Sequence, residues 1–153
     1  MLKALINQYK FERARAAKHA IVDLLDAVLP PLADGVTIVP VPTIPPHIRQ
    51  RGYDHMALVA RGFARRRQLS YRAAIQRASN TIQHGTTRAT RLRQAKQAFE
   101  CGDVPPGIYL LVDDVYTTGA TVRYAADVLL RAGATEVWIA VVSRQPFSRT
   151  ANV

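Results

Sequence analysis

One stretch near the end of the chain constrains the fold more than any other. It begins with five apolar residues, Ile108–Val112, continues through a polar turn at residues 113–118, and then shows helical spacing of apolar residues over 120–132. Gly133 is expected to end that helix, and a second apolar run follows at residues 136–142. Strand, helix and strand in this order predict a βαβ unit. We therefore predict an α/β fold with a mainly parallel sheet flanked by helices.

Two more helices and a strand are predicted ahead of this unit. Residues 12–29 and 53–67 repeat apolar side chains every three or four positions, which predicts amphipathic helices. Residues 36–41 predict a buried strand, the proline-rich residues 42–52 a loop or irregular turn, and residues 71–78 fit either a strand or a short helix. The side chains expected to face the core from the three helices are Ala17, Ile21, Leu24, Leu25, Val28, Met56, Val59, Ala60, Phe63, Val122, Ala125, Ala126, Leu129 and Leu130.

Length and composition indicate one cytoplasmic domain. The chain has 153 residues, 48% of them hydrophobic, which suits a single folded domain. We divide it into an N-terminal helical segment (about 1–35) and a core (about 36–145). No apolar run is long enough for a membrane span, and the N-terminus does not resemble a secretory signal. The only cysteine is Cys101, which excludes an internal disulfide and a cysteine-based zinc cluster and fits a reducing compartment.

The positive charge is concentrated in the middle of the chain. Lysine and arginine number 21 against 11 acidic residues, a formal net charge of +10, and the segment Arg61–Phe99 contains no acid. Such a segment favours a phosphate-bearing partner, either a nucleic acid or a polyphosphorylated small molecule, although it also fits a solvated basic face. Residues 79–98 have few apolar anchors and predict a long, mobile, basic loop.

The loop after the first strand of the βαβ unit is the predicted site, because parallel sheets bind ligands at the carboxyl ends of their strands. Hydroxyls of Thr117, Thr118 and Thr121, the small Gly119, and the N–H groups where the helix begins at Ala120 together predict a cradle for one phosphate group.

Two carboxylates, Asp113 and Asp114, come just before that loop. They would accept hydrogen bonds from sugar hydroxyls or help to hold Mg²⁺ through water. A ligand with a sugar diol at one end and a phosphate at the other fits this order. The alternative is structural: Thr118 or Thr121 caps a helix, and the two acids form an ordinary turn.

Other common sites are excluded or unsupported. The chain has neither the G-x-x-x-x-G-K-[ST] loop of nucleotide triphosphatases, nor the G-x-G-x-x-G dinucleotide fingerprint, nor a G-x-S-x-G elbow. The four histidines, His19, His47, His55 and His84, are scattered without zinc-site spacing, and we interpret them as surface residues.

The segment Leu110–Thr121 resembles the phosphoribosyl-diphosphate (PRPP) motif of type I phosphoribosyltransferases: hydrophobic residues, two acids and a Thr/Gly loop. The resemblance implies that Asp113 and Asp114 contact the ribose hydroxyls and take part in catalysis. It also implies that Thr117, Thr118, Gly119, Ala120 and Thr121 hold the 5′-phosphate.

Within that superfamily the chain is most similar to ComF-like proteins linked to competence and DNA uptake. The motifs that carry this resemblance are Val39-Pro40-Val41-Pro42, Arg49-x-Arg51-Gly52-Tyr53, Gln83-x-Gly85, Arg91 and Phe99. The similarity extends from about Tyr9 to Ser143. Asp54-His55, Thr86 and Gln94 differ from the residues usual in that family, and the chain lacks the four-cysteine zinc module of many members.

The resemblance implies a transferase that uses PRPP with Mg²⁺ and moves its phosphoribosyl group to an unidentified nucleobase, releasing pyrophosphate. Thr43, Arg49 and Arg51 would approach the diphosphate, and the loop at 80–98 would close over it. Arg91 is expected to be catalytic, and Arg88, Arg93 and Lys96 are further candidates for contacting the diphosphate. The alternative is a non-catalytic protein that senses PRPP or binds nucleic acid, with DNA or competence proteins as partners. The oligomeric state is left open, with a homodimer as one alternative.

Overall fold

A computed structural model describes residues 16–78, 98–116 and 118–144 of the chain. Its main sheet has four strands, all parallel, in the spatial order β2-β1-β5-β6. The strands are β1 (Thr37–Pro40), β2 (Ser70–Tyr71), β5 (Ile108–Tyr116) and β6 (Glu136–Arg144). β5 and β6 are neighbours joined through α5 (Ala120–Arg131), so the predicted βαβ unit and the α/β class are confirmed.

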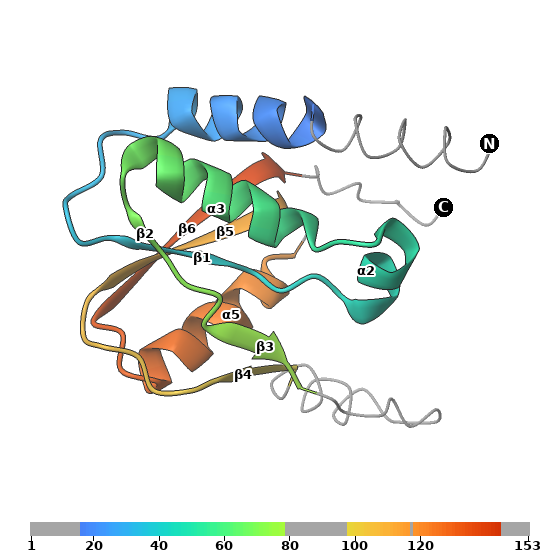
Figure 1. The fold of residues 1–153 in the computed structure, drawn as a ribbon. Coiled ribbons are helices and arrows are strands. Elements are labelled where there is room, and N and C mark those ends of the chain that lie inside the picture. Colours follow the sequence, from blue (N-terminus) through green and yellow to red (C-terminus); the bar gives the residue numbers. More distant parts are fainter. Residues whose placement is uncertain (1–15, 79–97, 117, 145–153) are drawn as a thin grey trace, which may run out of the picture.

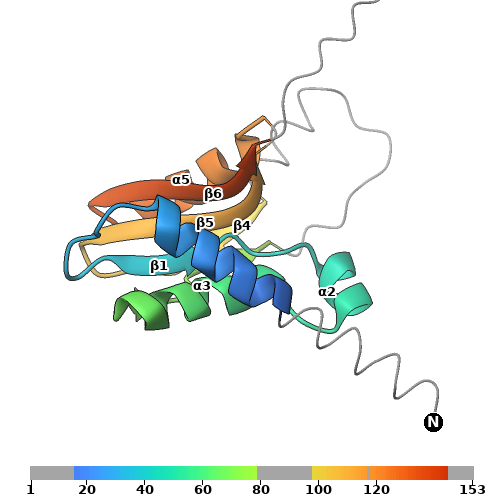
Figure 2. The same cartoon turned by 90° about the horizontal axis from the view of Figure 1, so that it is seen from above.

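Helices cover both faces of this sheet. The helix at residues 16–28 and α3 (His55–Arg67) lie on one face, and α5 lies on the other (Figures 1 and 2). A small antiparallel pair, β3 (Ile75–Arg77) and β4 (Phe99–Cys101), packs on the α5 side. Residues 71–78 thus contain the end of β2 and all of β3, joined by an irregular stretch, and no helix.

Each inner strand contributes to two cores, because successive side chains of a strand point to opposite faces. Ile38 of β1 and Leu110 of β5 pack against the helix at residues 16–28 and α3. Val39 of β1 and Leu111 of β5 pack against α5, β3 and β4. The sheet is therefore apolar on both faces, as its continuous hydrophobic runs predicted.

Two boundary predictions are wrong. Residues 42–52 are not irregular: Pro45–Arg51 form a short helix, α2, because Pro45 and Pro46 occupy its first positions, where a missing N–H breaks no helical hydrogen bond. Asp113 to Tyr116 are not a turn, because β5 continues through them, paired in parallel with β6 as far as Tyr116 and Arg144.

The predicted core faces of two helices also need correction. Leu24 and Val28 are 46% and 68% exposed, whereas Val22, which the spacing did not single out, is buried with Leu25. In α5, Leu130 is exposed and Val128 is buried. The apolar residues of α3 face the core as predicted, with Met56, Val59, Ala60 and Phe63 buried.

Ion pairs explain the orientation of the helix at residues 16–28. Arg66 and Arg67, at the C-terminal end of α3, pair with Asp23 and Asp26 of that helix. Arg67 also donates to the carbonyl oxygens of Asp26 (2.6 Å) and Leu29 (3.0 Å), near the helix C-terminus. Turning Asp23 and Asp26 toward α3 brings Val22 and Leu25 into the core and leaves Leu24 and Val28 outside.

Two other arginines of the basic segment also have partners within the protein. The guanidinium of Arg61 lies 5.0 Å from the ring centroid of Tyr71, and that of Arg77 lies 4.9 Å from the ring of Phe99. None of the helices within the described ranges has the length and apolar character that crossing a membrane requires.

We expect Arg67→Met to lower the free energy of unfolding by about 2 kcal/mol, because it removes a charge-assisted pair and leaves helix-terminal carbonyls without a donor. Urea unfolding followed by circular dichroism measures this. Arg65→Met is the matched control: Arg65 is exposed in the same turn of α3 and its variant should stay within about 0.5 kcal/mol of the parent. Equal losses for both variants would contradict a structural role for Arg67.

Candidate functional site

The end of β5 carries the two predicted acids out of the core. Asp113 is buried, and Asp114, one residue further along the strand, is half-exposed. The backbone N–H of Asp114 donates to Asp113 Oδ1 at 2.9 Å. Two neighbouring carboxylates thus differ in environment, one enclosed by the protein and one at its surface.

Burial raises the pKa of Asp113 from 3.8 to about 6, an increase that the hydrogen bond from the Asp114 N–H partly opposes. The negative charge of Asp114 adds to the increase. An ionised Asp113 is therefore costly, and a ligand that donates hydrogen bonds to it would offset that cost.

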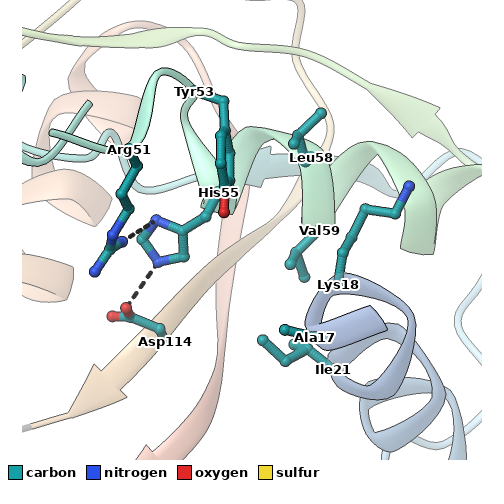
Figure 3. A pocket seen from close by; sticks show the side chains of 9 residues that line it. All are labelled: Ala17, Lys18, Ile21, Arg51, Tyr53, His55, Leu58, Val59 and Asp114. Atoms are coloured by element: carbon teal, nitrogen blue, oxygen red, sulfur yellow. Dashed lines mark hydrogen bonds and ion pairs between the residues drawn. The ribbon is translucent and has the colours of Figure 1, made fainter. Parts of the chain in front are cut away.

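His55, the first residue of α3, contacts the second acid. Its Nε2 lies 2.8 Å from Asp114 Oδ2, and its Nδ1 lies 2.9 Å from Arg51 Nη1 (Figure 3). Because a guanidinium only donates, Nδ1 must accept, and Nε2 carries the hydrogen that it donates to Asp114. The prediction that His55 is a surface residue is wrong, because it is half-buried and part of this chain of contacts.

Local sequence explains why His55 and Arg51 meet here. Gly52 has a positive φ of 82° and ends α2, a conformation that favours glycine, so the chain turns sharply between the two helices. Asp54 then caps α3 by accepting from the Ala57 N–H at 3.1 Å, and it also accepts from the Thr43 hydroxyl at 2.8 Å. The loop after β1 is thereby joined to the start of α3.

A pocket of about 260 Å³, here called the strand-end pocket, lies where these elements converge. Of the predicted site residues it brings together Thr43, Arg51, Asp113, Asp114 and Thr121. His47, His55 and Arg77 also line it, and none of these three was predicted. Arg77 is held there by donating to the Pro42 carbonyl at 2.9 Å.

Other predicted site residues lie elsewhere or are not described. Arg49 is exposed and does not line the strand-end pocket, and neither do Thr118 and Ala120, which are exposed at the start of α5. Thr118 Oγ1 lies 3.4 Å from the Ala120 N–H. The remaining predicted residues, Thr117, Arg88, Arg91, Arg93 and Lys96, fall outside the described residues, as does the predicted loop at 79–97.

Gly119 forms the corner between β5 and α5. It is buried, has a positive φ of 75°, and serves as the N-cap of α5 without a side chain. A Cβ atom placed there would lie 2.3 Å from the Tyr116 hydroxyl. The left-handed φ and the close approach of Tyr116 favour glycine at this corner. The N-terminus of α5, which follows directly, is the end of the helix that attracts anions.

A divalent ion is compatible with the carboxylates but has no ready-made protein site. Within the described ranges no group of three or more histidine, cysteine, aspartate or glutamate side chains is placed to hold a metal. Asp113 and Asp114 offer the oxygen donors that Mg²⁺ prefers, so such an ion would need further oxygens from a ligand or water.

The sequence gives little indication that Arg77 and His55 belong to the site. Arg77 lies in a segment whose secondary structure the pattern left open, and His55 follows a helix-capping aspartate that is visible only once α3 is placed. His55 and Asp114 are separated by 59 positions, so their contact depends on the tertiary fold.

Comparison with known families places residues 67–151 in the phosphoribosyl transferase domain. Several solved structures share the fold, and three of them are described below. The allosteric regulatory enzyme of purine biosynthesis aligns with a TM-score of 0.57 and 20% identity, covering 85% of this chain and 26% of the other. The glutamine phosphoribosylpyrophosphate amidotransferase of B. subtilis aligns with a TM-score of 0.55 and 22% identity, covering 83% of this chain and 26% of the other.

The orotate phosphoribosyltransferase of Aeropyrum pernix aligns with a TM-score of 0.52 and 20% identity, covering 85% of this chain and 72% of that enzyme. The chain thus spans about a quarter of the first two structures and most of the third. At these identities the likeness establishes the fold alone. No curated protein matches the chain.

We expect Gly119→Ala to lower the free energy of unfolding by about 2–4 kcal/mol, since a left-handed φ is combined with a clash against Tyr116. Thermal unfolding monitored by circular dichroism measures the loss. Gly102→Ala is the control, because a Cβ at Gly102 meets no atom within 4 Å. A fully stable Gly119→Ala protein would show that the corner rearranges freely.

Asp113→Asn should change how stability depends on pH. In the parent protein the folded-state pKa of Asp113 is about 6, above its ordinary value, so the contribution of Asp113 to stability is fully present below about pH 4 and is lost as the pH rises through 6. The asparagine variant lacks this fall, and relative to the parent it should gain up to about 3 kcal/mol between pH 4 and pH 7. Urea unfolding at both pH values measures the difference. A parallel pH dependence in the two proteins would contradict the raised pKa.

Proposed function

The chain belongs to the phosphoribosyl transferase domain family, and we propose that it binds PRPP in the strand-end pocket and transfers the phosphoribosyl group to a base, with release of pyrophosphate. The observation that carries this proposal is the convergence of both acids with Thr43, Arg51 and Thr121 in one pocket beside the Gly119 corner. These residues come from three separate parts of the sequence.

Each end of PRPP has a matching group in this arrangement. The carboxylates of Asp113 and Asp114 accept hydrogen bonds from the ribose hydroxyls. The 5′-phosphate lies against residues 117–121, where the N-terminus of α5 supplies N–H groups and the positive end of its dipole. The diphosphate lies toward Thr43 and Arg51, with Arg77 as a further cation lining the same pocket. We propose that Arg49, exposed on α2 outside this pocket, also approaches the diphosphate.

The transfer itself is a substitution at the anomeric carbon. A nitrogen lone pair of the acceptor forms the new bond to that carbon, the bond to the diphosphate oxygen breaks, and its electron pair leaves with pyrophosphate. Any proton on the attacking nitrogen passes to solvent. Positive charge develops on the sugar during this step, and the nearby carboxylates stabilise it. When bound, Mg²⁺ would neutralise diphosphate charge, with Asp113 and Asp114 contacting it through water.

We further propose that residues 79–98 close over the diphosphate, with Arg91 taking part in catalysis and Arg88, Arg93 and Lys96 contacting the anion. A basic segment with few apolar residues suits closure followed by release. The motifs at Val39–Pro42 and Arg49–Tyr53 support a place among ComF-like proteins, and hence a role in competence and DNA uptake. We propose that residues 1–153 form one such domain.

The ion pairs of the basic segment argue against the alternative of a nucleic-acid binding protein. Arg66 and Arg67 are engaged by Asp23 and Asp26, and Arg61 lies against the ring of Tyr71. These three arginines have partners within the fold, so they are poorly available to track a phosphate backbone. A protein that only senses PRPP would bind it in the same pocket. Turnover of PRPP distinguishes a transferase from such a sensor.

Titration calorimetry with PRPP and Mg²⁺ tests the binding site. We expect Asp114→Asn and Thr121→Val each to weaken PRPP binding by about 10- to 100-fold, because each loses a hydrogen bond to a charged or polyhydroxyl ligand. Asp103→Asn, an exposed acid away from the pocket, should bind like the parent. Absence of PRPP binding to the parent would contradict the proposal.

A pyrophosphate-release assay with a panel of nitrogen heterocycles separates an enzyme from a sensor. Release that depends on an acceptor and is lost in Asp114→Asn would support the transferase. Tight PRPP binding without release for any acceptor would instead support a sensor.

A further inference from the structure

A second pocket of about 260 Å³, here called the helix pocket, adjoins the strand-end pocket. The two share Arg51, His55 and Asp114 as a common wall. We propose that the helix pocket receives the acceptor and that this acceptor is a small, planar aromatic heterocycle carrying an anionic substituent. The inference rests on the proposed function, since it makes the helix pocket the partner of a PRPP site.

The middle of the helix pocket suits a flat ring. Ala17 and Ile21 of the helix at residues 16–28, here called the N-terminal helix, line one side of the pocket, and Leu58 and Val59 of α3 line the other (Figure 3). Tyr53 contributes an aromatic side chain. Apolar walls with an aromatic group favour a planar, unsaturated ligand over a polar, flexible one. Typical pockets for drug-sized molecules have about 300–1,000 Å³, so this smaller one suits a single or fused pair of rings.

The charges of the helix pocket are at its two sides. Asp114, His55 and Arg51 lie on one side, and Lys18 lies on the other (Figure 3). The Asp114 carboxylate already accepts from His55 at 2.8 Å. Lys18 has no hydrogen-bond or ion-pair partner in the described part of the chain. An anionic group on the far edge of the ring would supply that partner, whereas a cationic group would be repelled.

The shared wall places the ring beside the sugar. A ligand in the helix pocket is next to Asp114, the residue proposed to hold a ribose hydroxyl in the neighbouring pocket. A ring nitrogen on that side can face the anomeric carbon while the anionic substituent stays at Lys18. Holding both reactants in adjoining pockets reduces the entropy that the reaction would otherwise have to lose.

The helix that carries Ala17 and Lys18 is connected to α3 nearer its C-terminal end. Arg66 and Arg67 of α3 pair there with Asp23 and Asp26 of the same helix. These contacts favour the observed packing of the two helices and so reduce the ordering cost of binding between them.

The test uses nicotinate and nicotinamide, which share one ring and differ in the charge of one substituent. We expect nicotinate to bind the parent protein at least about tenfold more tightly than nicotinamide, as measured by ligand-observed NMR titration with and without PRPP and Mg²⁺. In Lys18→Met this preference should disappear while nicotinamide binding is unchanged. Equal binding of the two ligands to the parent would overturn the proposed ligand class.

Ala17→Phe tests the location, because a phenyl group at this position fills the helix pocket and does not touch the strand-end pocket. We expect it to weaken nicotinate binding at least about tenfold and to leave PRPP binding unchanged. Ala20→Phe is the matched control, since Ala20 is exposed on the same helix and lines neither pocket. Equal nicotinate binding by the two variants would overturn the assignment. Loss of PRPP binding in the parent would count against the proposed function alone, because the nicotinate comparison is also made without PRPP.

Discussion

The burial of the Asp113 carboxylate is the constraint on which the site depends. A carboxylate enclosed by protein is stable only where the backbone around it is held firmly. β5 meets this need because it is paired with β6 at Asp113 and beyond, and with β1 as far as the preceding residue, Val112. The strand continues past Asp113 to Tyr116 in register with β6, so Asp113 cannot turn outward without breaking the ladder. The sheet thus keeps a costly group in place for a ligand to use.

The second acid is positioned from the opposite side of the site. Asp114 is contacted by His55, whose location at the start of α3 follows from the cap formed by Asp54. Since Asp54 also accepts from Thr43, a change in the loop after β1 must disturb the start of α3 and, through His55, the carboxylate. The diphosphate side and the sugar side of the proposed site are therefore mechanically connected, which favours binding both ends of one ligand together.

Sequence patterns predicted the parts of the fold that rest on local burial. The apolar runs at Ile108–Val112 and 136–142 and the spacing within α3 depend on which residues must leave water, and a short window shows this. Predictions were wrong where contacts with residues distant in the sequence determine the local structure. Residues 113–116 look like a polar turn and become strand because β6 pairs with them, and the N-terminal helix turns toward α3 because of Arg66 and Arg67. The acids of the site could be predicted, but His55 and Arg77 could not, because only the tertiary fold brings them there.

The arginines of α3 show why net charge is a poor guide to a binding surface. Arg67 donates to the Asp26, Leu29 and Pro30 carbonyls and pairs with the Asp26 carboxylate, so its charge compensates the negative end of the neighbouring helix dipole. It thereby fixes the wall that Ala17 and Lys18 form in the helix pocket. Part of the excess positive charge stabilises the architecture around the site rather than a contact with a polyanion. The helix pocket itself has two cations, Arg51 on the wall shared with the strand-end pocket and Lys18 on the opposite side.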